Sequence, residues 1–172
     1  MSNSYLLINP SKPLSGKVSV SGAKNAVLTI IASLIITNGK STLHNVPSSS
    51  DVLQMIELLL DLGAKINFDH ATNILKVDTT SIDRFTVKPE IMNKMRASIL
   101  VMGPLLARFK KATVALPGGC LIGTRPIDFH LNGFRKLGIT FKQHEAFLTA
   151  KQDNRRNTKE KRIVFEYPSV GA

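Results

Sequence analysis

The sequence predicts an α/β (α+β) domain built from two copies of one repeated unit. Pro47 and Pro117 each follow an apolar helix-like run and a short strand-like run, and they stand 70 positions apart. The pairs Leu62-Gly63 and Leu137-Gly138 each end an amphipathic segment, and their glycines stand 75 positions apart. Helix-like and strand-like segments alternate between these landmarks. Landmarks repeated in the same order indicate a duplicated structural unit.

Each copy reads helix, strand, helix, strand. Apolar residues such as Val52 and Ile56 recur at helical spacing. Asp51 is the predicted N-cap of its helix, and Gly63 and Gly138 fit positions at which helices end. We expect helices over 24–37, 51–63 and about 126–138, with another that begins after residue 89, and strands over 41–43, 64–68, 74–77, 112–114, 139–142, 147–150 and 163–167.

Length and composition fit a globular protein that needs no disulfide or metal to form a core. The chain has 172 residues, 43% of them apolar and 20% charged. Its formal charge of +11 indicates an anionic ligand, and it leaves nucleic acid, acidic lipid, nucleotide sugar and phosphorylated metabolite open.

The single cysteine excludes an internal disulfide framework and favours a cytoplasmic protein. The first ten residues do not resemble a signal peptide, and the longest apolar stretch, residues 26–36, is too short to span a bilayer.

The second copy carries about five extra residues between Pro117 and its helix, Gly118-Gly119-Cys120-Leu121-Ile122. A loop added to a repeated scaffold is a candidate for function, and a neutral surface insertion is the alternative. Gly118 and Gly123 have P-loop spacing, but the Lys and Ser or Thr of that motif are absent, so we reject a nucleotide loop of that type. Cys120 is either a small buried residue or an exposed thiol that acts as a general acid or nucleophile.

Three cations stand near predicted helix starts: Lys24, Arg96 and Arg125. A cation there is locally unfavourable unless an anion binds it together with the free helix N–H groups. Side chains that point into solvent are the alternative, and the matching positions in a duplicated unit favour a phosphate or carboxylate site. The four histidines lack zinc-ligand spacing to one another or to Cys120, so we expect no metal and no cofactor. His130 is placed near the site by its proximity to Asp128.

Several motifs, in order along the chain, resemble those of the UDP-N-acetylglucosamine 1-carboxyvinyltransferases, a family of enolpyruvyl transferases. The motifs are Ser21-Gly22-Ala23-Lys24-Asn25-Ala26, Met95-Arg96-Ala97-Ser98, Leu116-Pro117-Gly118-Gly119-Cys120 with Ile122-Gly123 and Arg125-Pro126, and Ser169-Val170-Gly171-Ala172. The resemblance implies transfer of the enolpyruvyl group of phosphoenolpyruvate to the 3-hydroxyl of UDP-N-acetylglucosamine with release of phosphate. This is the first committed step of peptidoglycan synthesis.

The resemblance assigns roles position by position. Lys24, Arg96 and Arg125 correspond to catalytic cations that hold phosphoenolpyruvate, and Cys120 to the proton-donating cysteine that fosfomycin alkylates. Asp51 corresponds to an acidic position of the family. The positions that correspond to further substrate-binding residues are Asn25, Pro126, Ile127, Asp128, Phe129, Ser169, Val170 and Gly171.

The resemblance also implies an inside-out fold of repeated βαβαββ units. Family members have two lobes of three units each, and two of those units are visible here. Residues 1–21 are expected to be a strand segment that belongs to the other lobe, and residues 22–172 a partial lobe. The chain then corresponds to an N-terminal part of the enzyme, and the catalytic base, an Asp in the family, and further arginines belong to the other lobe. An apolar face is expected to be exposed where a third unit would pack.

Two other functions stay open on the residues alone. The related transferase that acts on shikimate 3-phosphate shares the fold, although the Gly-Gly-Cys loop and the Arg-Pro-Ile-Asp segment argue against it. A non-catalytic anion- or nucleic-acid-binding module is supported by the charge and by the lack of a base. The basic segment 151–162 contains no aromatic residue that could stack on bases, so we interpret it as a solvated loop and expect neither nucleic acid nor membrane as a partner.

Overall fold

The computed structural model describes residues 6–10, 12–92, 96–115, 127–144, 147–153 and 162–164. The first unit comprises α1 (Lys24–Thr37), β1 (Lys40–Leu43), α2 (Ser50–Asp61), β2 (Lys65–Asp69) and β3 (Ile74–Asp78). The second comprises α3 (Pro89–Met92), the 3₁₀ helix η1 (Arg96–Val101), α4 (Met102–Phe109), β4 (Lys111–Ala115), α5 (Asp128–Lys136), β5 (Ile139–His144) and β6 (Phe147–Gln152).

The two units form sheets of identical topology, which confirms the duplication. The first sheet has the order β1-β3-β2 and the second β4-β6-β5, so in each the last strand of the unit is central. All neighbours are antiparallel; Leu75 of β3, for example, stands opposite Leu43 and Phe68. In the first sheet, Leu75 and Val77 of the central strand are fully buried. Alternate residues therefore face the core, as a one-sided sheet requires.

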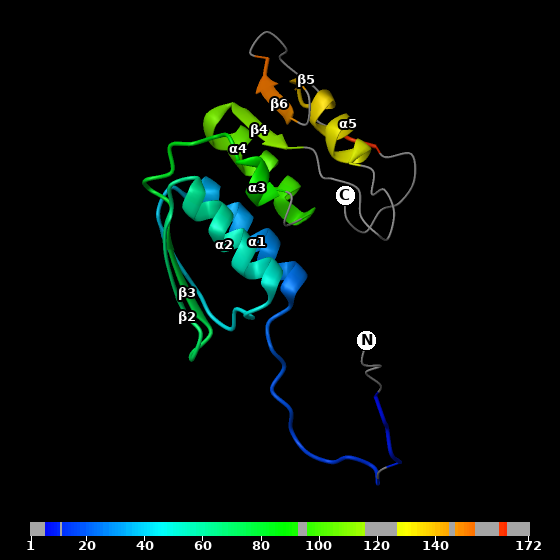
Figure 1. Cartoon of the computed structure of the whole chain (residues 1–172). Coiled ribbons are helices and arrows are strands. Elements are labelled where there is room, and N and C mark those ends of the chain that lie inside the picture. The colour runs from blue at the N-terminus through cyan, green and yellow to red at the C-terminus, as the bar shows by residue number, and fades with distance from the viewer. Residues whose placement is uncertain are drawn as a thin grey trace.

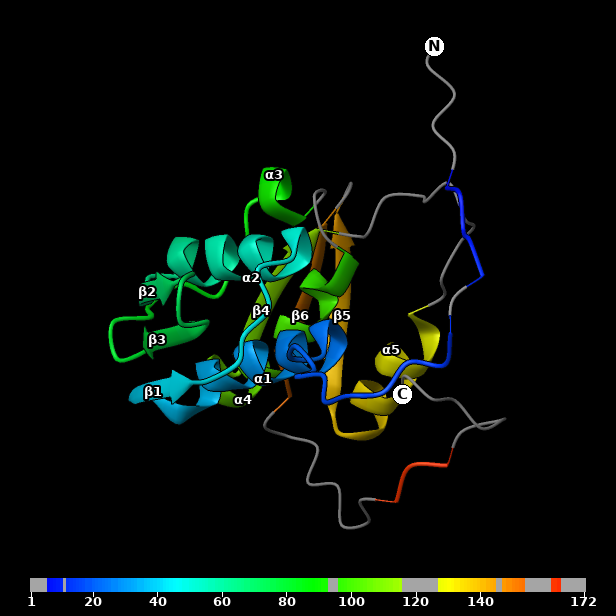
Figure 2. The ribbon, with the colours of Figure 1, turned by 90° about the horizontal axis from the view of Figure 1, so that it is seen from below.

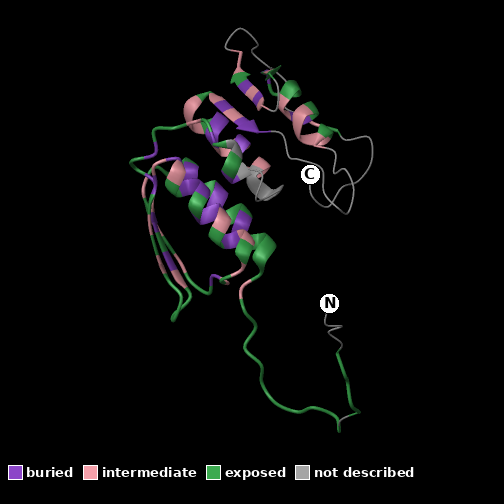
Figure 3. Ribbon diagram, viewed as in Figure 1, coloured by how far each residue is buried: buried purple, intermediate pink, exposed green. Residues whose placement is uncertain are grey.

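Helices occupy the middle of the molecule and sheets its outer sides, as the inside-out fold requires. α1 contacts both α2 and α4, and these helices lie between the two sheets (Figures 1 and 2). One continuous core contains Ile31 and Ile35 of α1, Leu58 of α2 and Leu105 of α4. Figure 3 shows buried residues alternating with exposed ones along these helices. The mixed helix and sheet class predicted from the sequence is confirmed.

Most predicted elements are present, and two helix starts were wrong. α1 matches its predicted bounds, and Gly63 and Gly138 follow α2 and α5 with φ of 106° and 82°. α2 begins at Ser50 with Ser49 as its N-cap, so Asp51 lies in the first turn and is not the cap. α5 begins at Asp128, two residues after the predicted start.

The segment after residue 89 is divided, where one helix was expected. It consists of α3, η1 and α4. Pro104 is the third residue of α4. A proline is tolerated in the first turn of a helix but disrupts its interior, so α4 must start near Pro104. The predicted strand over 163–167 is not formed at residues 163 and 164, and its remainder lies outside the described residues.

Arg108 of α4 joins the two units through its guanidinium group. It donates hydrogen bonds to the carbonyl oxygens of Ile35 (3.0 Å), Thr79 (2.9 Å) and Ile82 (3.1 Å), and to Asn38 Oδ1 (3.0 Å). All four acceptors belong to the first unit or to the segment that follows it. Because helix α1 leaves its last carbonyl groups without helical partners, Arg108 satisfies acceptors that would otherwise need water.

The described part of the N-terminal segment runs away from the helices (Figure 1). Residues 12–20 form no strand, and Leu14, Val18 and Val20 are 92%, 88% and 84% exposed. Among the described residues there is no helix with the length and apolar character needed to cross a membrane.

Candidate functional site

The starts of α1 and α2 bring Lys24 and Asp51 together. Lys24 is the first residue of α1, and Asp51 lies in the first turn of α2. Lys24 Nζ stands 2.5 Å from Asp51 Oδ2, and the side chains are 49% and 34% exposed. The ammonium group is therefore paired within the protein and still accessible to a solute. An anion that approaches Lys24 also meets the first N–H groups of α1, which carry partial positive charge.

Asn45 fixes the chain just before α1. The Gly22 N–H donates to Asn45 Oδ1 (3.2 Å), and Asn45 Nδ2 donates to the Val20 carbonyl oxygen (3.4 Å). A Cβ on Gly22 would stand 2.0 Å from the Asn45 carbonyl oxygen, so this position needs glycine. Asn45 was not predicted from the sequence. The glycine of the Ser21-Gly22 motif was the available signal, because a glycine before a helix can mark a close approach of two backbones.

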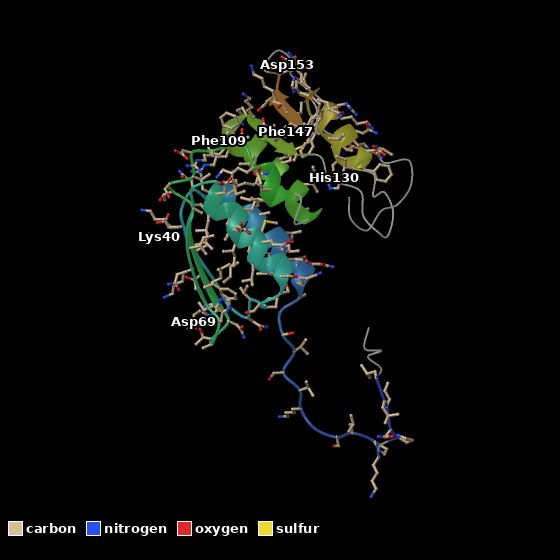
Figure 4. The ribbon with its side chains drawn as sticks, viewed as in Figure 1. Lys40, Asp69, Phe109, His130, Phe147 and Asp153 are labelled. Atoms are coloured by element: carbon tan, nitrogen blue, oxygen red, sulfur yellow. The ribbon has the colours of Figure 1, made fainter. Side chains whose placement is uncertain are left out.

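The predicted residues of the second unit lie elsewhere. Ile127 is the N-cap of α5, and Asp128 and Phe129 are its first two residues. α5 packs on β5, where Phe134 faces Phe141 with ring centroids 6.4 Å apart. Figure 1 shows α5 apart from the start of α1, and Figure 4 places His130 on α5. The structure therefore groups Lys24, Asn25 and Asp51 in one place and Ile127, Asp128 and Phe129 in another.

The remaining predicted site residues lie outside the described part of the structure. Arg96 begins η1, but its side chain is not described. The residues wholly outside are Cys120, Arg125, Pro126, Ser169, Val170 and Gly171. Their roles stay predictions. Within the described ranges, no group of three or more His, Cys, Asp or Glu side chains could hold a metal ion.

A second charged surface lies on the outer face of the first sheet. Asp78 of β3 stands between Lys40 of β1 and Lys65 of β2 in the strand register. Hydrogen bonds from the Thr80 hydroxyl and backbone N–H lower the pKa of Asp78, and the two lysines lower it further. A shallow hollow of ≈ 320 Å³ covers these residues and Lys76. None of the predicted site residues lines it.

Comparison with known proteins identifies the family. The family model described as EPSP synthase (3-phosphoshikimate 1-carboxyvinyltransferase) matches residues 8–172. The chain is 45% identical over 166 residues to the UDP-N-acetylglucosamine 1-carboxyvinyltransferase of Geotalea uraniireducens, covering 96% of this chain and 39% of the relative. It is 46% identical over 170 residues to UDP-N-acetylglucosamine 1-carboxyvinyltransferase 1 of Staphylococcus epidermidis, covering 97% and 39%.

Comparison with solved structures shows which fold the chain has. The crystal structure of the enolpyruvyl transferase NikO from Streptomyces tendae superposes with a TM-score of 0.68 at 20% sequence identity, covering 81% of this chain and 30% of that one. The chain thus spans about two fifths of the length of the curated relatives it matches.

Proposed function

Because the chain belongs to the EPSP synthase family of enolpyruvyl transferases, we propose that it supplies part of the active site that transfers enolpyruvyl from phosphoenolpyruvate to the 3-hydroxyl of UDP-N-acetylglucosamine. The observation that carries this proposal is identity of 45% and 46%, over 96% and 97% of the chain, to relatives named for that reaction. We place the reaction in the cytoplasm as the first committed step of peptidoglycan synthesis.

The reaction has two steps that this chain's residues can serve. The methylene carbon of phosphoenolpyruvate takes a proton, and the sugar oxygen bonds to the adjacent carbon as its hydroxyl proton goes to a base. A proton then leaves the methyl group and the carbon–oxygen bond to phosphate breaks, which restores the double bond. Cys120 is the proposed proton donor. Lys24, Arg96 and Arg125 offset the charge of phosphoenolpyruvate, and the base is proposed to come from a second lobe.

The exposure of Lys24 at the start of α1 supports its assignment as an anion ligand. Its ammonium is half exposed at the start of α1, where no acidic residue other than Asp51 contacts it among the described residues. Residues 1–21 are proposed to belong with the second lobe, and the exposed Leu14, Val18 and Val20 support this, since isolated apolar side chains gain free energy by packing. The sugar-binding roles of Asn25, Pro126, Ile127, Asp128, Phe129, Ser169, Val170 and Gly171 belong to the same proposal.

A chimera tests the proposed reaction. The chain replaces the matching segment of the Staphylococcus epidermidis relative, and phosphate release is measured with phosphoenolpyruvate plus UDP-N-acetylglucosamine. We expect release only when both substrates are present, and a loss of about 10²- to 10⁴-fold on Cys120→Ser. We also expect fosfomycin to add its mass to Cys120 and not to the serine variant.

The parent relative and a circular dichroism spectrum serve as controls for activity and folding. A folded chimera that releases no phosphate beside an active parent would contradict the proposal. Release stimulated by shikimate 3-phosphate and not by UDP-N-acetylglucosamine would instead assign the chain to the related reaction that the family model's description names.

A further inference from the structure

We propose that Asn45 is a positioning residue, which acts through Gly22 to hold Lys24 against Asp51 at the start of α1. The inference rests on the proposed function, because it concerns the cation assigned to the anionic substrate. Among the described residues, no hydrogen bond joins Asn45 directly to that cation. Its role follows from two contacts with the segment that leads into α1 and from a third that anchors the loop that carries Asn45.

The first contact is the bridge made by the Asn45 side chain. Its Oδ1 accepts from the Gly22 N–H at 3.2 Å, and its Nδ2 donates to the Val20 carbonyl oxygen at 3.4 Å. The bridge thus spans the peptides on either side of Ser21, which lie two to three residues before the first residue of α1. Ala23, the N-cap of α1, makes no side-chain capping hydrogen bond. The direction of the chain at this helix start therefore depends on a side chain 23 positions away in sequence.

The second contact is the close approach of Gly22 to the backbone of Asn45 and to the ring of Pro47. A Cβ at Gly22 would lie 2.0 Å from the Asn45 carbonyl oxygen and 3.1 Å from Pro47 Cδ, so the two segments touch with no room for a side chain. Asn45 has a φ of 57°, in the left-handed region that asparagine tolerates better than most residues.

The third contact anchors the loop that carries Asn45. Val46 is 1% exposed, and its N–H donates to the Asn73 carbonyl oxygen at 2.9 Å. Ser48 Oγ stands 3.1 Å from His70 Nδ1. Asn73 and His70 belong to the turn between β2 and β3, so the first hairpin supports the loop. Asn45 transmits this restraint to the start of α1, and the same loop leads directly into α2 and Asp51.

The consequence concerns the Lys24 ammonium group. Its pair with Asp51 at 2.5 Å spans the first turns of two helices. Holding both helix starts in place favours this pair, because it keeps the two side chains within reach of each other. Without the Asn45 bridge, the segment before α1 loses its hydrogen bonds and the pair opens more often. A half-exposed lysine that is not held in one place binds an anion with a larger loss of side-chain entropy.

Substitution of Asn45 by glycine distinguishes the effect of the side chain from the effect of the backbone conformation. Asn45→Gly keeps the positive φ, which glycine adopts without strain, and removes the bridging side chain. The matched control is Asn73→Gly, because Asn73 has a φ of 55° and offers its backbone carbonyl, which glycine retains. Asn45→Asp is the conservative variant, since its carboxylate still accepts from the Gly22 N–H.

Two readouts on the 172-residue chain test the proposal. Acetylation of Lys24 by acetic anhydride is followed by peptide mass spectrometry, with the exposed Lys40 as the internal reference. Because exposed ion pairs are weak, we expect Lys24 to react about two- to fivefold faster in Asn45→Gly and Asp51→Asn. Exchange of the Gly22 amide hydrogen should also accelerate in Asn45→Gly. Neither readout should change in Asn73→Gly, and Asn45→Asp should keep the slow Gly22 exchange.

The double variant Asn45→Gly with Asp51→Asn shows whether both residues act on one pair. We expect no further acceleration over Asp51→Asn alone, as for two parts of one interaction. Unchanged Lys24 acetylation and Gly22 exchange in Asn45→Gly would overturn the proposal, and so would an equal acceleration in Asn73→Gly.

Protection by ligand tests the proposed function separately. Saturating phosphoenolpyruvate, with and without UDP-N-acetylglucosamine, is expected to slow acetylation of Lys24 and not of Lys40. If no protection occurs but the variants still differ as expected, Asn45 positions the pair and the assignment of Lys24 to phosphoenolpyruvate is wrong in this chain. If protection occurs and the variants do not differ, the assignment stands and the positioning role is wrong.

Discussion

The two units share a sheet topology, yet their first helices are tied to the fold in different ways. In the second unit, the segment that leads into α3 pairs with β4. Thr86 forms a parallel bridge to Thr113, the Val87 N–H donates to the Thr113 carbonyl at 3.1 Å, and the Thr113 N–H donates to the Phe85 carbonyl at 2.8 Å. In the first unit, residues 17–20 form no strand, and the Asn45 side chain bonds the Val20 carbonyl and the Gly22 N–H. Backbone pairing in one copy is thus replaced by a side chain in the other.

This difference matters because the replaced contact stands beside a predicted site residue. A backbone ladder restrains several peptides at once and tolerates most side chains. The contact in the first unit depends on one asparagine and one glycine, and Lys24 follows it directly. We therefore expect the start of α1 to respond to single substitutions more than the segment before α3 does.

The largest effect is expected where the units meet. Arg108→Ala removes four hydrogen bonds and leaves the carbonyls of Ile35, Thr79 and Ile82 without this donor. We expect the free energy of unfolding, measured by urea denaturation, to fall by about 2–4 kcal/mol. Arg135→Ala is the matched control, because that exposed guanidinium bonds Asn132 within α5 and should cost under about 1 kcal/mol. Equal losses would show that Arg108 does not join the units.

The local elements could be predicted from the sequence, whereas their long-range contacts could not. α1, β2, β3, β5 and β6 follow from periodicity and from Gly63 and Gly138, signals that lie within each segment. The start of α2 was placed wrongly because the Asp51 carboxylate pairs with a lysine 27 positions away and does not cap its own helix. The division before α4 was signalled by Pro104 and overlooked.

The candidate site shows the same limit. Lys24 and Asp51 were both identified, since a motif and a helix start are visible in sequence. Their contact, the Gly22–Asn45 contact and the central position of β3 in its sheet depend on how distant segments pack. No local pattern encodes the distance between residues that meet only after the sheet and helices have formed.

A pair of glycine substitutions sharpens the comparison of the units. Gly22→Ala places a Cβ 2.0 Å from the Asn45 carbonyl oxygen, which cannot move without displacing the loop. We expect a loss of about 1–3 kcal/mol in the free energy of unfolding. Gly133→Ala in α5 brings its Cβ only to 3.8 Å from Ile163 Cδ1, an ordinary contact, and gains up to about 1 kcal/mol from helix propensity.

Thermal unfolding followed by circular dichroism measures both glycine variants. Changes of opposite sign are expected. If Gly22→Ala were neutral, the close approach of the two segments would not be a requirement of the first unit, and the proposed dependence of Lys24 on it would lose its basis.

The smallest expected effect concerns the turn that supports Asn45. Asp69 ends β2 at the tip of the first hairpin (Figure 4). In the second unit, the corresponding strand β5 ends at His144. The Thr72 hydroxyl donates to the Asp69 carboxylate, and this bond, with the Ala71 and Thr72 N–H groups, lowers the pKa of Asp69 despite some desolvation. The ionised carboxylate therefore favours the folded turn.

The sign of the pH dependence follows from this direction. A carboxyl whose pKa is lower in the folded protein stabilises the fold fully above its unfolded pKa of about 3.9, and the contribution disappears as the pH falls through the folded pKa. We expect an NMR titration of Asp69 to give a pKa below the usual aspartate value, and Thr72→Val to raise it towards that value. The Asp78 carboxyl, held by Thr80, should stay unchanged in that variant and serves as the control. Faster exchange of the Gly22 amide in Thr72→Val at pH 3–4 would show that the hairpin, the loop and the start of α1 are coupled. In the second unit, backbone pairing takes the place of these contacts.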